Sequence, residues 1–143
     1  MNAPQLMQRI TQRRGVRQFV KFGIVGASGF ALNLAIFTFI FALTPVADHS
    51  RIYMLAYSVA FLAGGVSNYV FNRIWTFRAT GPALVQGIQF LTVSAIALGV
   101  GLLVSHLFEP ALGPGHKLWL LATISGMFVN FFINKYWTFR PAA

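Results

Sequence analysis

The chain has 143 residues, of which 57% are hydrophobic and only 9% are charged. A soluble domain carries roughly 25% charged residues, so this composition argues against a soluble enzyme and against a disordered chain. The net charge is +9, but the basic residues lie between long apolar runs, which is typical of an oriented membrane protein rather than a nucleic-acid-binding one. Without cysteine, the chain forms no disulfide and no thiolate metal site.

Four stretches free of Asp, Glu, Lys and Arg divide the chain, and they hold 26, 21, 30 and 17 residues. A helix needs about 20 apolar residues to cross a bilayer, and the runs are too long for buried strands. We therefore predict an all-α integral membrane protein with one membrane domain over residues 22–140. Its four transmembrane helices are expected near residues 22–43, 53–72, 85–108 and 118–134.

The basic residues are distributed unequally between the two sides of these spans. Nine lie before the first span, between the second and third, or after the fourth, and only Arg51 and Lys117 lie in the other two loops. Because positively charged loops stay in the cytoplasm, both termini are predicted to be cytoplasmic, and a dual-topology protein is disfavoured.

Residues 1–21 form a basic segment on this predicted cytoplasmic side. Apolar Leu6, Met7 and Ile10 are interspersed with four arginines. The pattern fits a short interfacial helix on anionic lipid. It fits equally a solvated basic tail that only sets the orientation, and the sequence leaves both open.

The first span carries Gly23, Gly26 and Gly29 at a period of three. No strand precedes them, so they do not form a dinucleotide fingerprint, and close helix packing is the better interpretation. Asn33 places an amide inside the same span. It forms either a single satisfied interhelical hydrogen bond or part of a polar path through the membrane.

His106 is the titratable side chain that lies well inside an apolar run, near the outer end of the third span. An interfacial histidine near Glu109 is the favoured interpretation, and a proton relay is the alternative. Three histidines without clustered carboxylates predict no metal site.

The strongest feature is an internal repeat. The sequence Asn-Arg-Ile-Trp-Thr-Phe-Arg at residues 72–78 recurs as Asn-Lys-Tyr-Trp-Thr-Phe-Arg at residues 134–140. Eight of nineteen positions are identical between residues 60–78 and residues 122–140. The repeat predicts two helical hairpins of two spans each, related by an axis along the membrane normal.

The repeated identities are spaced by four, so they share one slowly drifting helix face. The small residues of this face are predicted to allow close helix packing. They are Ala60, Gly64, Ala122 and Gly126.

The polar members lie near the predicted cytoplasmic boundary. Four asparagines belong to this polar part, namely Asn68, Asn72, Asn130 and Asn134. They act either as interhelical hydrogen-bonding groups or, together with Asn33, as a polar path for a headgroup. The neighbouring cations would bind a phosphate, namely Arg73, Arg78, Lys135 and Arg140. Trp75 and Trp137 suit the aromatic belt at the membrane interface.

The start of the first span at residues 17–26 and the doubled Asn-(Arg/Lys)-x-Trp-Thr-Phe-Arg ending resemble the GtrA-like family of small membrane proteins. The resemblance covers residues 17–140. It implies a multi-pass protein of the bacterial cytoplasmic membrane that flips a polyprenyl-phosphate-linked monosaccharide for cell-surface polysaccharide synthesis. Such a protein is not an enzyme and needs no cofactor. Its expected partners are the lipid-linked sugar, membrane lipid and a glycosyltransferase, with no nucleic acid.

The alternative implied by the resemblance is a non-transporting subunit that recruits or stabilises a polyprenyl-phosphate glycosyltransferase. Many family members carry an acidic residue where Asn33 stands, so coupling through such an acid is not expected here. A proton-coupled multidrug exporter is disfavoured because Asp48 and Glu109 both lie in the outer loops. Four helices surround little space, so a homo-oligomer that pairs the stripes of several copies is a further hypothesis.

Overall fold

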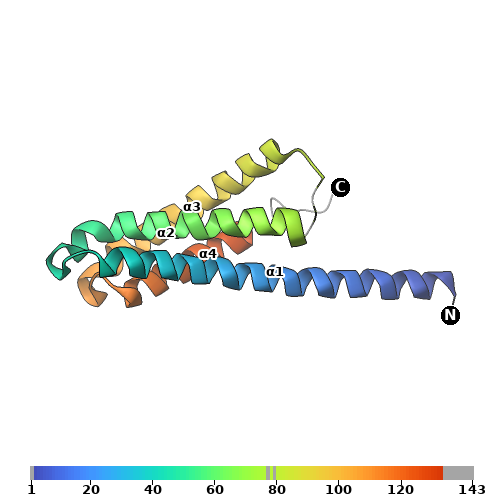
Figure 1. Ribbon diagram of the computed structural model, residues 1–143, viewed down its shortest axis with the longest axis horizontal. Coiled ribbons are helices and arrows are strands. Elements are labelled where there is room, and N and C mark those ends of the chain that lie inside the picture. The colour runs from blue at the N-terminus through green and yellow to red at the C-terminus, as the bar shows by residue number, and fades with distance from the viewer. Residues whose placement is uncertain (1, 77, 79, 134–143) are drawn as a thin grey trace.

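The computed structural model describes residues 2–76, 78 and 80–133, and these residues form helices without any strand. Three helical stretches are long and apolar enough to cross a membrane, and a fourth helix follows them (Figure 1). The prediction of an all-α membrane protein with four helices is confirmed. The elements in chain order are α1 (Ala3–Ala42), η1 (Val46–Asp48), α2 (His49–Phe71), η2 (Asn72–Thr76), α3 (Ala83–Leu112) and α4 (His116–Ile133).

The helices form two hairpins, α1 with α2 and α3 with α4. Both hairpin turns lie at one end of the bundle, on the left in Figure 1. We name this the acidic end, after Asp48 and Glu109. The N-terminus and the connection between α2 and α3 lie at the opposite end, which we name the basic end, after Lys21, Arg73 and Arg78.

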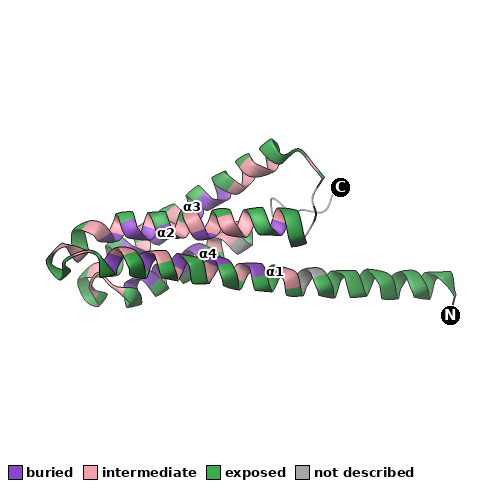
Figure 2. Cartoon of the chain, viewed as in Figure 1, coloured by how far each residue is buried: buried purple, intermediate pink, exposed green. Residues whose placement is uncertain are grey.

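Helix α1 is much longer than the predicted span, because it begins at Ala3 and passes through the whole basic segment. Arginine, glutamine and lysine are good helix formers, so charge alone does not end a helix. The added part continues the span in a straight line, and residues 2–17 are exposed (Figures 1 and 2). A helix along the surface of the membrane stays a prediction. At its other end α1 stops before Pro45. A proline disfavours helical geometry in the residue that precedes it.

The core lies in the half of the bundle toward the acidic end, where buried residues concentrate (Figure 2). Aromatic rings from three helices meet there. Phe37 of α1 lies 4.4 Å from Phe41 and 5.6 Å from Tyr53 of α2, measured between ring centroids, and 5.9 Å from Trp119 of α4. Toward the basic end the first part of α3 diverges from α2 (Figure 1).

Glycines allow the helices of each hairpin to approach closely. A Cβ atom at Gly64 would lie 2.6 Å from the carbonyl oxygen of Gly29, so α1 and α2 touch backbone to backbone. A Cβ at Gly126 of α4 would lie 3.1 Å from the carbonyl oxygen of Ala97 in α3. Ala60 and Ala122 are fully buried. Gly23 and Gly26, by contrast, have no such neighbour within 4 Å among the described residues.

Candidate functional site

The repeated motif ends α2 in an unusual way, because residues Asn72–Thr76 form a π-helical turn. Along this turn the polar side chains bond one another. Asn72 Nδ2 donates to Asn68 Oδ1 at 2.9 Å, and Thr76 Oγ1 donates to Asn72 Oδ1 at 2.8 Å. Asn72 and Thr76 are 8% and 4% exposed. In the first copy of the repeat, the polar side chains spaced by four therefore hydrogen-bond one another along their own helix.

Trp75, in the same turn, is tied to α1. Lys21 Nζ lies 4.9 Å from the centre of the Trp75 ring and donates a 3.4 Å hydrogen bond to the Trp75 carbonyl oxygen. A cation over an indole face is attracted by the ring quadrupole. Lys21 thus holds α1 to this turn.

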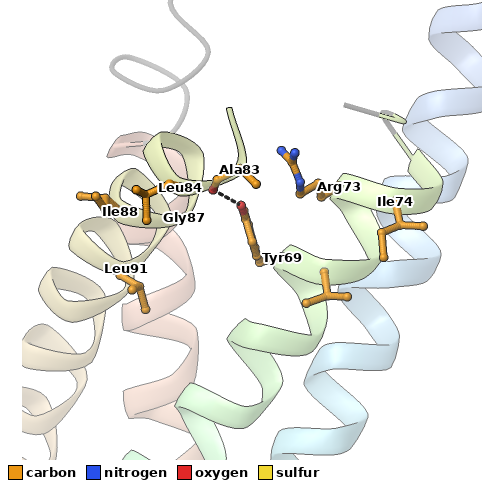
Figure 3. Close-up of a pocket in the computed structure, with 9 residues that line it drawn as sticks. Tyr69, Arg73, Ile74, Ala83, Leu84, Gly87, Ile88 and Leu91 are labelled. Carbon is orange, nitrogen blue, oxygen red and sulfur yellow. Dashed lines mark hydrogen bonds between the residues drawn. The ribbon is translucent and has the colours of Figure 1, made fainter. Parts of the chain in front are cut away.

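A groove of about 380 Å³ lies between the end of α2 and the start of α3, at the basic end (Figure 3). Its walls are almost entirely apolar, and Figure 3 shows them contributed by both helices. The apolar side chains are Val70, Ile74, Leu84, Ile88 and Leu91.

Arg73 lies at the mouth of this groove, with its guanidinium reaching toward the segment that precedes α3. Nη1 donates to Gln86 Oε1, and Nη2 donates to the Gly81 carbonyl oxygen at 2.9 Å. A guanidinium carries five N–H donors, so these two bonds fix its position and leave others for an anion. The groove therefore combines an apolar trough with one oriented cation.

Tyr69 crosses the groove from α2 to α3 (Figure 3). Its hydroxyl donates a 3.3 Å hydrogen bond to the Ala83 carbonyl oxygen, and its ring stacks on Phe90 with a centroid distance of 4.7 Å. A Cβ at Gly87 would lie 3.7 Å from the hydroxyl, an ordinary contact, so Gly87 lies directly beside Tyr69. Tyr69 thus links the two hairpins across the groove.

The chain matches the family described as GtrA/DPMS, transmembrane domain, over residues 21–139. It belongs to this family. The chain is also 33% identical over 137 residues to the uncharacterized membrane protein YngA of Bacillus subtilis (strain 168), an alignment that covers 91% of this chain and 84% of the relative. No solved structure matches.

Membership of the GtrA/DPMS family confirms the resemblance found in the sequence. It identifies a multi-pass membrane protein linked to the handling of polyprenyl-phosphate sugars. The matched residues include all of the groove and extend beyond α4.

Among the predicted site residues of this GtrA/DPMS chain that the structure describes, Arg73 lines the groove. Asn33 lies elsewhere, buried at 4% exposure, and accepts a 3.0 Å hydrogen bond from Trp119 Nε1. Asn130 is half-buried on α4, and Arg78 is exposed with a left-handed backbone, φ 45°. The remaining predicted residues lie outside the described part of the chain, namely Asn134, Lys135, Trp137 and Arg140.

Sequence reasoning did not single out Tyr69, which bridges the groove to Ala83, or Gln86, which accepts a hydrogen bond from Arg73. A signal was present in both cases. Gln86 is a polar residue at the start of a long apolar run, and Tyr69 directly follows the repeated Asn68. The sequence does not show which helix either residue faces, because this depends on the angle at which α2 and α3 cross.

Proposed function

We propose that this protein moves a polyprenyl-phosphate-linked monosaccharide across the bacterial cytoplasmic membrane, for the glycosylation of cell-surface polysaccharide. The observation that carries the proposal is the groove at the basic end, an apolar trough with the Arg73 guanidinium at its mouth. A polyprenyl phosphate has the same two parts, a hydrocarbon chain and an anionic group. The membership of the GtrA/DPMS family supports this class of substrate.

In this proposal the two parts of the lipid occupy different parts of the groove. The isoprenoid chain lies against Ile74, Leu84 and Ile88, whose side chains offer no hydrogen bonds and suit hydrocarbon. The phosphate binds Arg73, since a fixed guanidinium forms charge-assisted bonds to phosphate oxygens. The sugar extends beyond the phosphate toward the seam between α2 and α3.

The proposed orientation places the basic end in the cytoplasm. Nine of the eleven basic residues lie on that side in the sequence pattern, and the positive-inside rule then sets both termini in the cytoplasm. The groove would open toward the leaflet in which a cytoplasmic glycosyltransferase makes its lipid-linked product.

Transport in sealed proteoliposomes tests the proposal. The purified protein is reconstituted with a radiolabelled polyprenyl-phosphate sugar, and an impermeant reagent reports the outer leaflet. Wild type should exchange the lipid between leaflets faster than empty vesicles do. Arg73→Gln should slow this exchange about tenfold or more, because it removes the charge that binds phosphate.

Arg51→Gln is the matched control, because Arg51 is an exposed arginine at the opposite end. It should transport as wild type does. Equal exchange in wild-type and empty vesicles, with the protein folded, would contradict the flippase proposal. Transport by Arg73→Gln at the wild-type rate would show that phosphate binding by Arg73 in the groove is not part of the mechanism.

One observation favours the second candidate function, a non-transporting subunit that recruits a glycosyltransferase. The first part of α1 projects from the bundle as an exposed basic helix, with Arg9, Arg13 and Arg17 spaced by four (Figure 1). Such a helix can dock an acidic partner surface. Copurification of a glycosyltransferase that is lost when residues 3–16 are removed, together with absent transport, would favour this function. A homo-oligomer is compatible with either function.

A further inference from the structure

A second pocket of about 330 Å³ lies at the acidic end, on the far side of the bundle from the groove. It is built from three segments, the start of α2, the end of α3 and the turn that follows. Its residues are Ser50, His106, Glu109, Pro110 and Pro114. Ser50 Oγ donates a hydrogen bond to Glu109 Oε1, which joins the first hairpin to the second. The pocket is therefore lined by a carboxylate, an imidazole, a hydroxyl and two proline rings.

The carboxylate of this pocket is not neutralised by a cation. Asp48, the other acidic residue of the chain, pairs with Arg51 at 3.8 Å. Within the described residues Glu109 forms no salt bridge, and no Lys or Arg lines the pocket. An anionic ligand would be repelled by an unpaired carboxylate. The pocket thus has the opposite electrostatic character to the groove, where Arg73 supplies positive charge.

A line of hydroxyl groups leads from this pocket into the bundle along the seam between α2 and α3. Ser105 Oγ and Tyr53 Oη hydrogen-bond each other at 3.3 Å, one helical turn below Glu109, and Ser105 Oγ also donates to the Gly101 carbonyl oxygen at 2.8 Å. One turn further, the Tyr57 hydroxyl fits against Gly101, where a Cβ would lie only 1.9 Å from it.

The line ends at two buried hydroxyls. Tyr57 of α2 is fully buried, and Thr123 of α4 is 1% exposed. The Thr123 hydroxyl faces that of Tyr57, and neither forms a hydrogen bond of good geometry among the described residues. Unpaired buried hydroxyls cost stability. Tyr57→Phe would keep the ring packing and remove only the hydroxyl, so this variant isolates what the hydroxyl contributes.

We propose that Ser50, His106 and Glu109 form a second binding site, which takes the hydroxyl groups of an uncharged monosaccharide. A carboxylate can accept two hydrogen bonds from neighbouring sugar hydroxyls, and an imidazole and a serine add one donor or acceptor each. The proline rings present apolar surface to the C–H face of a pyranose. The small volume fits a single sugar ring rather than an oligosaccharide.

This site complements the groove, since one site binds the phosphate and the other binds the sugar. We identify this monosaccharide with the headgroup of the transported lipid after the headgroup has crossed the membrane, and this identification rests on the proposed function. The binding of a free sugar at the acidic end does not rest on it.

Sugar binding can be measured without transport. The full-length protein in lipid nanodiscs is mixed with free D-glucose, D-galactose or N-acetyl-D-glucosamine at millimolar concentration, and saturation-transfer NMR reports contact. Wild type should bind at least one of these sugars. Glu109→Gln should weaken that binding about tenfold, because it replaces charge-assisted hydrogen bonds by neutral ones of the same geometry. Ser50→Ala should weaken it as well.

Asp48→Asn is the matched control, since it removes the other carboxylate of the same end without touching the pocket. It should bind sugar as wild type does. Absence of binding by any of the three sugars overturns the second site. Sugar binding by Glu109→Gln that equals wild-type binding also overturns it. The same holds if the protein binds calcium through Glu109 and binds no sugar.

The transport assay separates this inference from the proposed function. Transport without sugar binding at the acidic end overturns the second site and leaves the flippase proposal standing. Sugar binding that depends on Glu109, in a protein that does not transport, overturns the flippase proposal and leaves the second site standing.

Discussion

Trp119 of α4 donates a 3.0 Å hydrogen bond from its indole Nε1 to Asn33 Oδ1 of α1, and both side chains are buried. This bond joins the two hairpins on the side of the bundle away from the groove. Phe30 supports it, because its ring lies 5.3 Å from the Trp119 ring. The hairpins are thus joined by a buried polar contact between α1 and α4, in addition to the bonds that Tyr69 and Arg73 make across the groove.

A double-mutant cycle on this pair should reveal its contribution to stability. Asn33→Leu and Trp119→Phe each leave a polar group without its partner, whereas the double variant removes both groups. We expect a coupling free energy of about 0.6 to 1.7 kcal/mol, the range of hydrogen bonds between membrane helices. Unfolding equilibria in bilayers measure it. Trp75→Phe combined with Asn33→Leu is the control, and its effects should add; additive effects for Asn33 with Trp119 would contradict the contact.

The four helices could be predicted because membrane spans depend on a local property, the length of an uncharged run. The exact helix bounds could not. Helix α1 begins at Ala3 rather than near residue 22, since charged residues end the apolar run but not the helix. Helix α3 extends to Leu112 rather than residue 108 and contains Pro110. The length of an uncharged run predicts the part of a helix that spans the membrane, but not how far the helix continues beyond it.

The candidate site was predictable only in part. Arg73 was singled out as a cation at a predicted membrane boundary within a repeated motif, and the structure places it at the groove, while its binding of phosphate stays a prediction. Spacing by four correctly placed Asn68 and Asn72 on one face, but it could not show that their amides bond each other. Tyr69 and Gln86 act through the crossing of α2 and α3, and pairs from different helices leave no periodic signal in a single sequence.

Replacement of Gly64 by alanine should destabilise the first hairpin. The new methyl group would lie 2.6 Å from the Gly29 carbonyl oxygen and 3.1 Å from Asn33 Cβ. Because backbone cannot rotate away, the helices must separate, at a cost of about 1–3 kcal/mol. Thermal unfolding in detergent measures the loss. Gly65→Ala is the neighbouring control, with only an ordinary 3.5 Å contact to Phe90, and a loss as large there would refute the close approach at Gly64.

The orientation of the chain can be measured directly, because the natural sequence contains no cysteine. Ala47→Cys introduces a thiol at the acidic end, and Thr80→Cys introduces one at the basic end; both positions are exposed. With the basic end in the cytoplasm, an impermeant maleimide added to intact cells should label Ala47→Cys alone. Thr80→Cys should react only after the membrane is permeabilised. The reverse pattern would refute the cytoplasmic placement of the termini, and labelling of both in intact cells would show two topologies.

Tyr57→Phe should separate stability from function. The Tyr57 hydroxyl is buried and forms no hydrogen bond of good geometry in the described structure, so its removal should leave the free energy of unfolding unchanged or raise it by up to about 1 kcal/mol. Tyr53→Phe is the matched variant, because it loses the 3.3 Å bond to Ser105 and should be destabilised instead. If the line of hydroxyls guides the sugar, Tyr57→Phe should also slow transport in proteoliposomes several-fold although the protein is at least as stable. Full transport by this variant would show that the Tyr57 hydroxyl takes no part in the path, and a marked loss of stability would show that it has a partner after all.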